Sequence, residues 1–446
     1  MNIKTMITKQ LNIENLSNNI KADESTGHLL FAGRDTVELA KKYGTPLYLL
    51  DESYVRGMCR LYADTMKEAF DNYSMPLYAS KALSFKGIYK IINSEGIGAD
   101  VASIGEFFTA LQADFPADRI MFHGNNKTDE DISFAITRKV GCFVCDNREE
   151  LESINRIAKQ YGVKQRIMIR VTPGIDPHTH AKINTGRIDS KFGVAIETRQ
   201  AEEITAYALS LSNIDLRGFH CHIGSQIFDF EPFCDAARIM LKFIADMKNS
   251  LGYSARYLNL GGGMGVRYVS DDPIIDYRSN ILKIGEIVKE ECARLHINRP
   301  HIFMEPGRSI VAAAGMTLYS VGAIKVIEGF KNYVSIDGGM TDNPRYALYN
   351  SAYTVALANR VYDSANFDCT IAGRCCESGD LIQEKVKIPR PVRGDILAVA
   401  TTGAYNYSMA SNYNRIPRPP IVVLSNKKEY YGVRREKLSD LIQNDE

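Results

Sequence analysis

The chain has 446 residues, of which 45% are hydrophobic and 24% are charged, and its formal net charge is +1. This composition is typical of a globular protein that is large enough for two or three domains. A nearly neutral chain lacks the basic field that attracts nucleic acid or an anionic membrane surface. We therefore expect neither kind of partner, and we look for the function in a site for a small molecule.

The N-terminal segment and the cysteines bear on the compartment. The segment MNIKTMITKQLNIENLSNN lacks the apolar core of a signal peptide, and no later stretch approaches the length of a membrane span. The nine cysteines show no disulfide-like spacing. We therefore expect a cytoplasmic chain with reduced thiols. Cys142 and Cys145 form a C-x-x-C that we interpret as packed core residues.

Short apolar runs alternate with longer amphipathic segments between residues 75 and 307. The runs are rich in β-branched and aromatic residues, as buried strands are, and segments such as ESINRIAKQYG show helical periodicity. Eight strands that alternate with helices predict a (β/α)8 barrel of the TIM type. The eight runs are MPLYASK from Met75, GIGADVA from Gly96, RIMFHG from Arg119, GCFVCD from Gly141, QRIMIRV from Gln165, LRGFHCHIG from Leu216, ARYLNLGG from Ala255 and HIFMEPG from His301.

After about Ser309 the pattern changes to strands with few helices, as in TLYSVGAIKVI, NYVSIDGG, GDILAVAT and PPIVVLS. We therefore predict an α/β chain with a barrel and a C-terminal, mainly β domain, a β-barrel or sandwich. The early segments GHLLFAG and TPLYLLDE are expected to add strands to that domain. The predicted domains are residues 1–50 as the N-terminal contribution to the β domain, 51–308 as the barrel and 309–446 as the C-terminal β domain.

Polar residues or glycines stand at the carboxyl ends of the predicted barrel strands. Reactive groups of such barrels converge there, because strand ends and loops meet at one mouth. Eight such ends are too many for a purely structural barrel, and they predict a site. The residues are Lys81, Asp100 followed by Glu106, His123, Asp146, Arg170, His222, Gly261–Gly263, and Glu305 with Arg308.

Three of these ends suggest chemistry. A lysine that is desolvated at a barrel mouth becomes a nucleophile toward aldehydes, although Lys81 could instead be a surface residue. The Gly261–Gly263 run follows the seventh strand, where barrels bind phosphate, and its spacing disfavours a dinucleotide fingerprint; a plain tight turn is the alternative. Glu305 would keep a pyridine nitrogen protonated, or would form a structural ion pair with Arg308.

His220 and His222 lie two residues apart and face the same side of a strand, as a metal-binding pair does. No third ligand stands at a matching spacing, so we expect no metal. Stacking of His222 on a cofactor ring fits the surrounding phosphate-type features better.

Together these residues resemble the fold-type-III pyridoxal-phosphate decarboxylases, a family that includes ornithine, arginine and diaminopimelate decarboxylases. The resemblance extends from Thr45 to Pro419 and is carried by YASKA at Tyr78–Ala82, DVASIGE at Asp100–Glu106 and HIGS at His222–Ser225. It implies pyridoxal 5'-phosphate as the cofactor, bonded to Lys81, with Glu305 at its ring nitrogen. The implied cofactor-binding residues are Lys81, Asp100, His222, Ser225, Gly261, Gly262, Gly263, Glu305, Arg308 and Tyr405.

Other segments are similar to the diaminopimelate branch of this family. They are FHGNNK at Phe122–Lys127, HTH at His178–His180, SKFG at Ser190–Gly193 and DNPRYALY at Asp342–Tyr349. The resemblance implies the decarboxylation of meso-2,6-diaminopimelate to L-lysine and carbon dioxide, the last step of lysine biosynthesis. A second carboxylate and amine on the substrate call for a guanidinium and a carboxylate together. The implied substrate-binding residues are Arg308, Arg345, Tyr349, Glu377 and Tyr405.

The segment CCESGD at Cys375–Asp380 resembles the one that carries the family's catalytic cysteine. The resemblance implies that Cys376 is the proton donor, and that Cys376 and Glu377 complete the site of a neighbouring subunit in a homodimer. The chain departs from the family pattern at Arg374 and Cys375, in place of a lysine and a histidine, at Tyr346, in place of a proline, and at Leu83, in place of an asparagine.

These departures leave fine substrate preference open. One alternative is a decarboxylase of ornithine, arginine or lysine on the same fold. Another is a catalytically inactive relative that binds partners, which the presence of both Lys81 and Cys376 disfavours.

Overall fold

The computed structural model describes residues 13–175, 191–426 and 428–446. Contacts divide the chain into two compact units. The barrel unit comprises Arg56–Gly265 and Ile275–Ser309, and the sheet unit comprises Met1–Val55, Val266–Ile274 and Ile310–Glu446. Residues 266–274 thus group with the sheet unit, and the three-part division at residues 50 and 308 stays a prediction. The segments His178–His180 and Ser190 lie outside the described residues.

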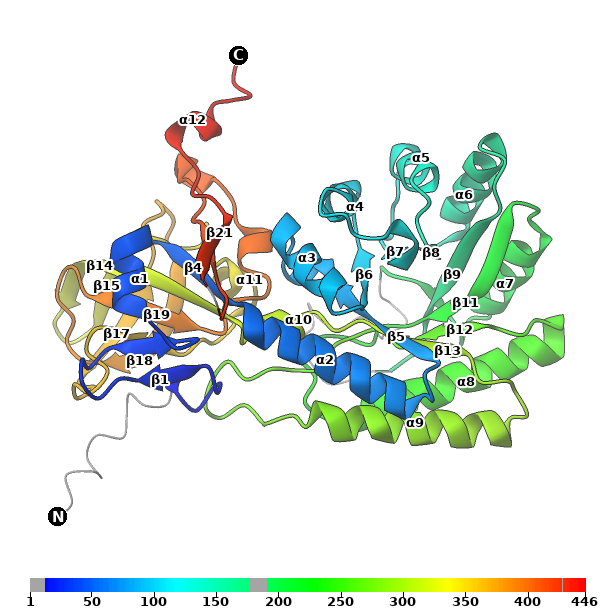
Figure 1. Ribbon diagram of the computed structural model, residues 1–446, viewed down its shortest axis with the longest axis horizontal. Coiled ribbons are helices and arrows are strands. Elements are labelled where there is room, and N and C mark those ends of the chain that lie inside the picture. Colours follow the sequence, from blue (N-terminus) through cyan, green and yellow to red (C-terminus); the bar gives the residue numbers. More distant parts are fainter. Residues whose placement is uncertain (1–12, 176–190, 427) are drawn as a thin grey trace. The chain divides into compact units, whose positions relative to one another are not determined.

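The barrel unit is built on a closed ring of parallel strands (Figure 1). Each strand pairs with the next along the chain, β8 pairs with β9, and β13 pairs back to β5, which closes the ring. The predicted eight-stranded parallel barrel is therefore confirmed. Its strands are β5 (Ser74–Ala79), β6 (Gly98–Val101), β7 (Ile120–Phe122), β8 (Cys142–Cys145), β9 (Gln165–Thr172), β11 (Ile214–His220), β12 (Tyr257–Asn259) and β13 (His301–Met304), and β10 (Val194–Ala195) pairs in parallel with the end of β9.

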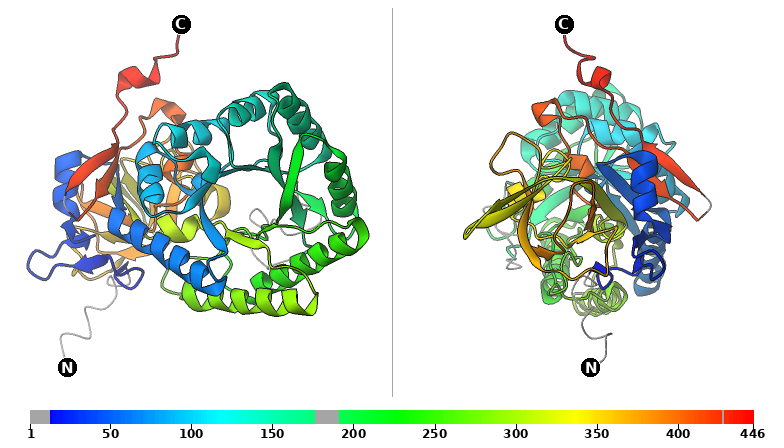
Figure 2. Two further views of the ribbon diagram at one scale, coloured as in Figure 1. Left: turned by 45° about the vertical axis from the view of Figure 1, so that its right-hand side comes forward. Right: turned by 90° about the vertical axis from the view of Figure 1, so that its left-hand side faces the viewer.

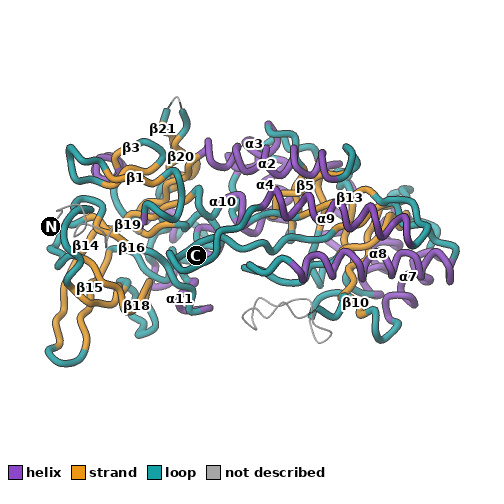
Figure 3. Tube along the Cα trace, turned by 90° about the horizontal axis from the view of Figure 1, so that it is seen from below, coloured by secondary structure: helices purple, strands orange, loops and turns teal. Residues whose placement is uncertain are grey.

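Helices surround this ring (Figure 2, left). Each helix buries an apolar face, and several begin at a side-chain cap, such as Ser103 before α4 and Asn147 before α6, which satisfies free backbone N–H groups. Helices α8 and α9 run side by side on the outside (Figures 1 and 3). The helices are α2 (Glu52–Ala69), which begins in the sheet unit, α3 (Lys86–Ser94), α4 (Ile104–Leu111), α5 (Asp129–Thr137), α6 (Arg148–Gln160), α7 (Gln200–Ser210), α8 (Glu231–Leu251) and α9 (Tyr277–Arg294).

Apolar side chains cluster inside the barrel, as its strands' near-continuous hydrophobicity predicts. Cys142 belongs to this core and Cys145 is also buried, and neither forms a disulfide. Both cysteines are thus packed residues, as the sequence indicated. In barrels of this kind the chemistry lies at the carboxyl ends of the strands and in the loops that follow them.

The sheet unit contains a nine-stranded sheet in which an N-terminal strand is central. Strand β4 pairs antiparallel with β14 and parallel with β20, so the segment TPLYLLDE is taken up between C-terminal strands as predicted. Short helices α1 (Thr36–Tyr43), α10 (Arg308–Val311), α11 (Arg345–Tyr349) and α12 (Leu438–Leu441) accompany it. The strands are β4 (Leu47–Asp51), β14 (Gly315–Ile327), β15 (Lys331–Ile336), β16 (Val355–Leu357), β17 (Phe367–Ala372), β18 (Leu381–Ile388), β19 (Ile396–Ala400), β20 (Ile421–Leu424) and β21 (Glu429–Val433).

The segment GHLLFAG differs from expectation. It forms β2 (Leu29–Phe31), which pairs with β1 (Ile20–Ala22) and β3 (Arg34–Asp35) in a separate three-stranded sheet. The left-handed conformations of Ala32 and Gly33 turn the chain back on itself, so the nearest partner of β2 is the strand that follows it. Its buried side chains still pack into the apolar core of the sheet unit.

Among the described residues we find no helix that is both long and apolar enough to cross a bilayer.

Candidate active site at the barrel mouth

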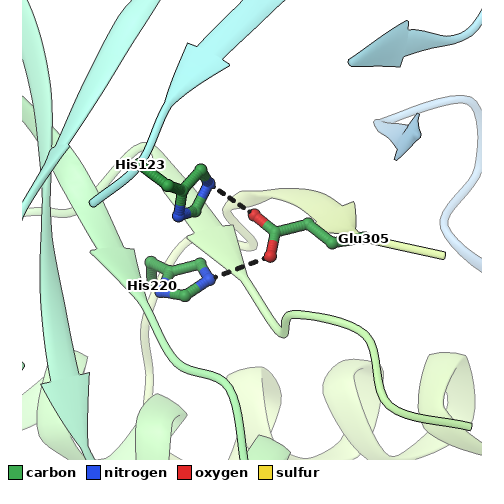
Figure 4. Close-up of side chains that lie close together, drawn as sticks. All are labelled: His123, His220 and Glu305. Atoms are coloured by element: carbon green, nitrogen blue, oxygen red, sulfur yellow. Dashed lines mark hydrogen bonds and ion pairs between the residues drawn. The ribbon is translucent and has the colours of Figure 1, made fainter. Parts of the chain in front are cut away.

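Glu305 is the centre of a buried polar cluster at the carboxyl ends of four barrel strands. It follows β13, while His123 follows β7, His220 ends β11 and Asn259 ends β12. Figure 4 shows both imidazole rings directed at the Glu305 carboxylate. None of the four side chains belongs to a residue more than 9% exposed, so the cluster lies in a low-dielectric environment.

The two oxygens of the Glu305 carboxylate have different partners. His123 Nε2 lies 2.8 Å from Oε1, and His220 Nε2 lies 3.1 Å from Oε2 (Figure 4). The Asn259 amide also donates to Oε1, over 2.7 Å. A buried carboxylate with several such partners is stabilised in its charged form, because hydrogen bonds and opposite charge favour ionisation.

Burial and these neighbours shift the ionisation of the cluster. Burial by itself would raise the pKa of Glu305, but His123 and His220 outweigh it and hold that pKa well below its usual range. Burial lowers the pKa of His220 to about 4, so its ring is neutral near pH 7. Burial and then the Glu305 charge raise the pKa of Asp100 to about 7. Glu305 is thus firmly ionised, whereas Asp100 in the same mouth holds its proton more readily.

The glycine run forms a cradle in which backbone groups approach closely. A Cβ on Gly262 would lie 2.1 Å from the Glu305 carbonyl oxygen, and one on Gly263 would lie 2.2 Å from the Gly224 carbonyl oxygen. Gly261 and Gly263 also adopt positive φ angles. Side chains are therefore excluded, and only backbone lies at this part of the mouth, as the close approach of a phosphate requires.

His222 and Ser225 lie next to this cradle. The Gly262 N–H donates to His222 Nδ1 over 3.3 Å, which assigns the proton of a neutral His222 ring to Nε2. Burial lowers the pKa of His222 well below its usual range. Arg308 Nη2 donates to Ser225 Oγ over 2.9 Å, so a buried guanidinium and a hydroxyl stand together as anion-binding groups.

Lys81 lies in the 3-10 turn Ser80–Ala82, directly after β5. Its side chain is exposed, in contrast to the desolvated position that the apolar strand suggested. Its charge nevertheless opposes the rise in the pKa of Asp100 and contributes to the lowered pKa of His222, which places it among the groups of the mouth. The ion pairs of Glu305 within the described residues are with His123 and His220, so the alternative of a Glu305–Arg308 pair is not supported.

The remaining predicted site residues belong to the sheet unit. Arg345 is buried at the start of α11, and its Nη1 donates to Tyr268 over 2.8 Å and to Tyr353 over 3.1 Å. Its guanidinium also lies 6.0 Å from the centre of the Tyr405 ring. Within the described chain no carboxylate forms an ion pair with Arg345, so this buried cation has only neutral polar partners there. Tyr349 ends α11 and is half-buried.

Cys376 and Glu377 lie in the loop between β17 and β18. Both are exposed, and Cys376 is a free thiol, whereas the preceding Cys375 is buried. The Cys376 backbone N–H donates to Asn414 over 2.8 Å, and the Glu377 carboxylate accepts from its near neighbours Ser378 and Gly379. The loop is thus held at its backbone while both functional side chains face outward.

The partners of these residues could not be identified from the sequence. Asn259 is next to the glycine run, but nothing in its spacing pointed to Glu305. The structure brings His220 together with His123 rather than with His222, and the donor atoms of His123, His220 and Glu305 all lie within 4.8 Å of one another. The tyrosines around Arg345 were not found either, since Tyr268 is 77 residues away in the chain.

Comparison with known proteins gives a consistent result. Residues 58–312 match the family model described as the pyridoxal binding domain of pyridoxal-dependent decarboxylases. The chain is 43% identical over 422 residues to the diaminopimelate decarboxylase of Bacillus subtilis (strain 168), covering 94% of this chain and 95% of that one. It is 42% identical over 420 residues to the diaminopimelate decarboxylase of Staphylococcus aureus (strain COL), covering 94% of this chain and 98% of that one.

Solved structures agree with these relatives. The diaminopimelate decarboxylase of M. jannaschii in co-complex with L-lysine superposes with a TM-score of 0.87 and 33% identity, covering 96% of this chain and 98% of that one. The diaminopimelate decarboxylase of Helicobacter pylori complexed with L-lysine gives a TM-score of 0.81 and 33% identity, covering 92% of this chain and 98% of that one.

Proposed function

The chain belongs to the family of pyridoxal-dependent decarboxylases, and on that premise we propose that it converts meso-2,6-diaminopimelate to L-lysine and carbon dioxide, the last step of lysine biosynthesis. The relatives and solved structures named above are diaminopimelate decarboxylases, and they match this chain over most of its length. The observation that carries the proposal within the molecule is the buried, ionised Glu305 beside a glycine cradle at the barrel mouth.

The residues of the mouth fit pyridoxal phosphate. A pyridine nitrogen that is to stay protonated needs a buried, charged carboxylate, and Glu305 supplies one. The cradle at Gly261–Gly263 excludes side chains, and Ser225 with Arg308 adds a hydroxyl and a guanidinium for the phosphate. The ring of His222 is anchored at Nδ1 and is proposed to stack on the cofactor.

We assign the chemical steps to named side chains. Lys81 would supply the amine that holds the cofactor covalently. Bound pyridoxal phosphate would supply an electron sink for the electron pair that stays on the α-carbon when carbon dioxide leaves. Glu305 keeps the proton on the ring nitrogen, Asp100 lies beside it in the mouth, and Cys376 donates the proton that replaces the lost carboxylate.

Substrate recognition is assigned to a further set of residues. The distal carboxylate of the substrate needs a fork-shaped cation, and the buried Arg345 has no carboxylate partner in the described chain. Glu377 is proposed to bind the distal ammonium, with Tyr349, Tyr405 and Arg308 as further contacts. A substrate without the second carboxylate would leave Arg345 buried and unpaired, which is the physical basis for selectivity.

A homodimer is part of the proposal. Cys376 and Glu377 face outward on their loop, and we propose that they complete the site of a second copy of the chain. All nine cysteines are free, as expected in a reducing compartment, and a cytoplasmic location is proposed on that ground.

The proposal is tested by carbon dioxide release from the purified protein with added pyridoxal phosphate. Turnover is expected with meso-2,6-diaminopimelate and at least about a hundredfold lower kcat/KM with ornithine, arginine or lysine. A preference for one of these three substrates would overturn the role of Arg345. Bound cofactor without turnover of any of them would favour an inactive, partner-binding relative.

A further inference from the structure

We infer that His123 and His220 are positioning residues, which fix the orientation of the Glu305 carboxylate and leave one acceptor position, on Oε2, for the ring nitrogen of the cofactor. The inference rests on the proposed role of Glu305 and extends it to side chains that touch neither substrate nor the reacting atoms.

The contacts of the two carboxylate oxygens are unequal. Oε1 is approached by Asn259 Nδ2 at 2.7 Å and His123 Nε2 at 2.8 Å, whereas His220 Nε2 is the contact of Oε2 within the described residues. A carboxylate oxygen accepts about two hydrogen bonds. The protein therefore occupies Oε1 with two contacts and Oε2 with one, and the larger free acceptor capacity is on Oε2.

The imidazole rings of His123 and His220 also contact each other. Their centroids lie 4.8 Å apart with the planes at 71°, the edge-to-face arrangement that aromatic rings prefer. His123 follows β7 and His220 ends β11, so the carboxylate contacts side chains from two different parts of the barrel ring (Figure 4). Rotation of Glu305 would break contacts to both strands at once.

Asn259 links this cluster to the cradle. Its side-chain amide donates to Glu305, and its side-chain oxygen accepts from the Gly261 N–H over 2.9 Å. The group assigned to the ring nitrogen and the group assigned to the phosphate are thus joined through one residue. The three donors to Glu305 belong to a network that sets the site before the cofactor enters.

Two histidines and a carboxylate could also bind a metal ion, but the geometry favours the positioning role. Metal binding requires lone pairs on both imidazoles directed at a common point. Here each Nε2 faces a separate oxygen at hydrogen-bonding distance, and burial of the His220 ring leaves it neutral, with Nε2–H as the donor (Figure 4).

The test compares variants that separate the N–H donor from the ring. His123→Phe and His220→Phe keep the ring and remove the donor; His123→Gln and His220→Gln keep a donor near the Nε2 position and remove the ring. The first readout is the ¹⁵N chemical shift of the ring nitrogen in bound, ¹⁵N-labelled pyridoxal phosphate. We expect a protonated nitrogen in the wild type and in both Gln variants, and a shift toward the unprotonated value in both Phe variants.

The second readout is kinetic. In the Phe variants kcat is expected to fall about tenfold or more while KM changes less than about threefold, with partial recovery in the Gln variants. His301→Leu is the matched control, because His301 is a half-buried histidine at the other end of β13. It is expected to leave the nitrogen shift unchanged. Loss of stability in the Phe variants with an unchanged nitrogen shift and kcat would overturn the inference.

A measurement on the wild type keeps the inference testable if a Phe variant fails to fold. Histidine ¹⁵N shifts of the holoenzyme should place the His220 proton on Nε2, and a proton on Nδ1 alone would overturn the inference. So would Zn²⁺ bound to the apoprotein through both rings and displaced by pyridoxal phosphate.

Glu305→Gln separates this inference from the proposed function. If that variant leaves the ring nitrogen protonated, the role of Glu305 itself fails. If it deprotonates the nitrogen and the Phe variants do not, only the positioning role fails.

Discussion

The barrel mouth and the Cys375–Asp380 loop both carry proposed catalytic groups, but a single chain completes them to different degrees. At the mouth, Glu305 is buried and has three partners from three other strands. In the loop, Cys376 and Glu377 are exposed, and the structure holds their backbone rather than their functional atoms. Rigid strand ends can preorganise charge within one subunit, whereas a loop that faces outward is suited to a role in an assembly.

The largest loss of activity is expected when Lys81 is substituted. Lys81→Ala should remove the covalent attachment of the cofactor and lower turnover by at least about a thousandfold, because no other amine takes over its role. Absorbance of the bound cofactor and carbon dioxide release measure the two losses. Lys86→Ala is the control, since Lys86 is an exposed lysine at the start of α3, and it should behave as the wild type. Normal activity of Lys81→Ala would remove the barrel mouth from the mechanism.

Cys376→Ala tests the other region. It should lower kcat by about a hundredfold with little change in KM, because proton donation by a positioned group contributes about that factor. Cys375→Ala, at the neighbouring buried thiol, should instead lower the melting temperature with a smaller effect on kcat.

A mixture of the two inactive variants tests whether the mouth of one subunit is completed by the loop of the other. If the loop completes the partner's site, refolded mixtures of Lys81→Ala and Cys376→Ala contain hybrid dimers in which one site has both residues. In an equal mixture about half of the dimers are hybrids, and each hybrid has one complete site out of two. Activity should then recover to about a quarter of the wild-type value. No recovery in dimers shown to exchange subunits would place both residues in the same chain's site.

Arg345→Gln is expected to act on binding. Loss of a buried guanidinium from a carboxylate contact costs about 2–3 kcal/mol, so KM for meso-2,6-diaminopimelate should rise about 30- to 150-fold with a smaller change in kcat. Steady-state kinetics measure both values. The exposed Arg393→Gln in the same unit serves as the control. An unchanged KM would mean that another cation binds the distal carboxylate.

The smallest effect concerns Asp100 in the apoprotein. Because burial raises its pKa to about 7 from 3.8, the folded state binds its proton more tightly than the unfolded state does. That contribution to stability is fully present below pH 3.8 and is lost as the pH rises toward 7. Asp100→Asn should therefore raise the melting temperature of the apoprotein more at pH 8 than at pH 5, as thermal unfolding would measure. An equal gain at both values would contradict the shifted pKa.

Some of the site could be predicted from the sequence because parallel barrels place all strand ends at one mouth. Lys81, the glycine run and Glu305 each follow an apolar run, so their convergence follows from topology alone. The strands in TPLYLLDE and GHLLFAG were both recognisable from their pattern, although the pairing of GHLLFAG was not, since a local turn gave it a nearer partner.

Only the tertiary structure decided which side chains act together. The contact of His220 with Glu305 joins residues 85 apart, and that of Arg345 with Tyr268 joins residues 77 apart. Hydrogen bonds and ionisation depend on distances of a few ångströms and on burial, and neither is encoded in the local pattern of a strand. The sequence by itself determined the barrel and the residues at its rim, and packing determined the charge and the orientation of Glu305.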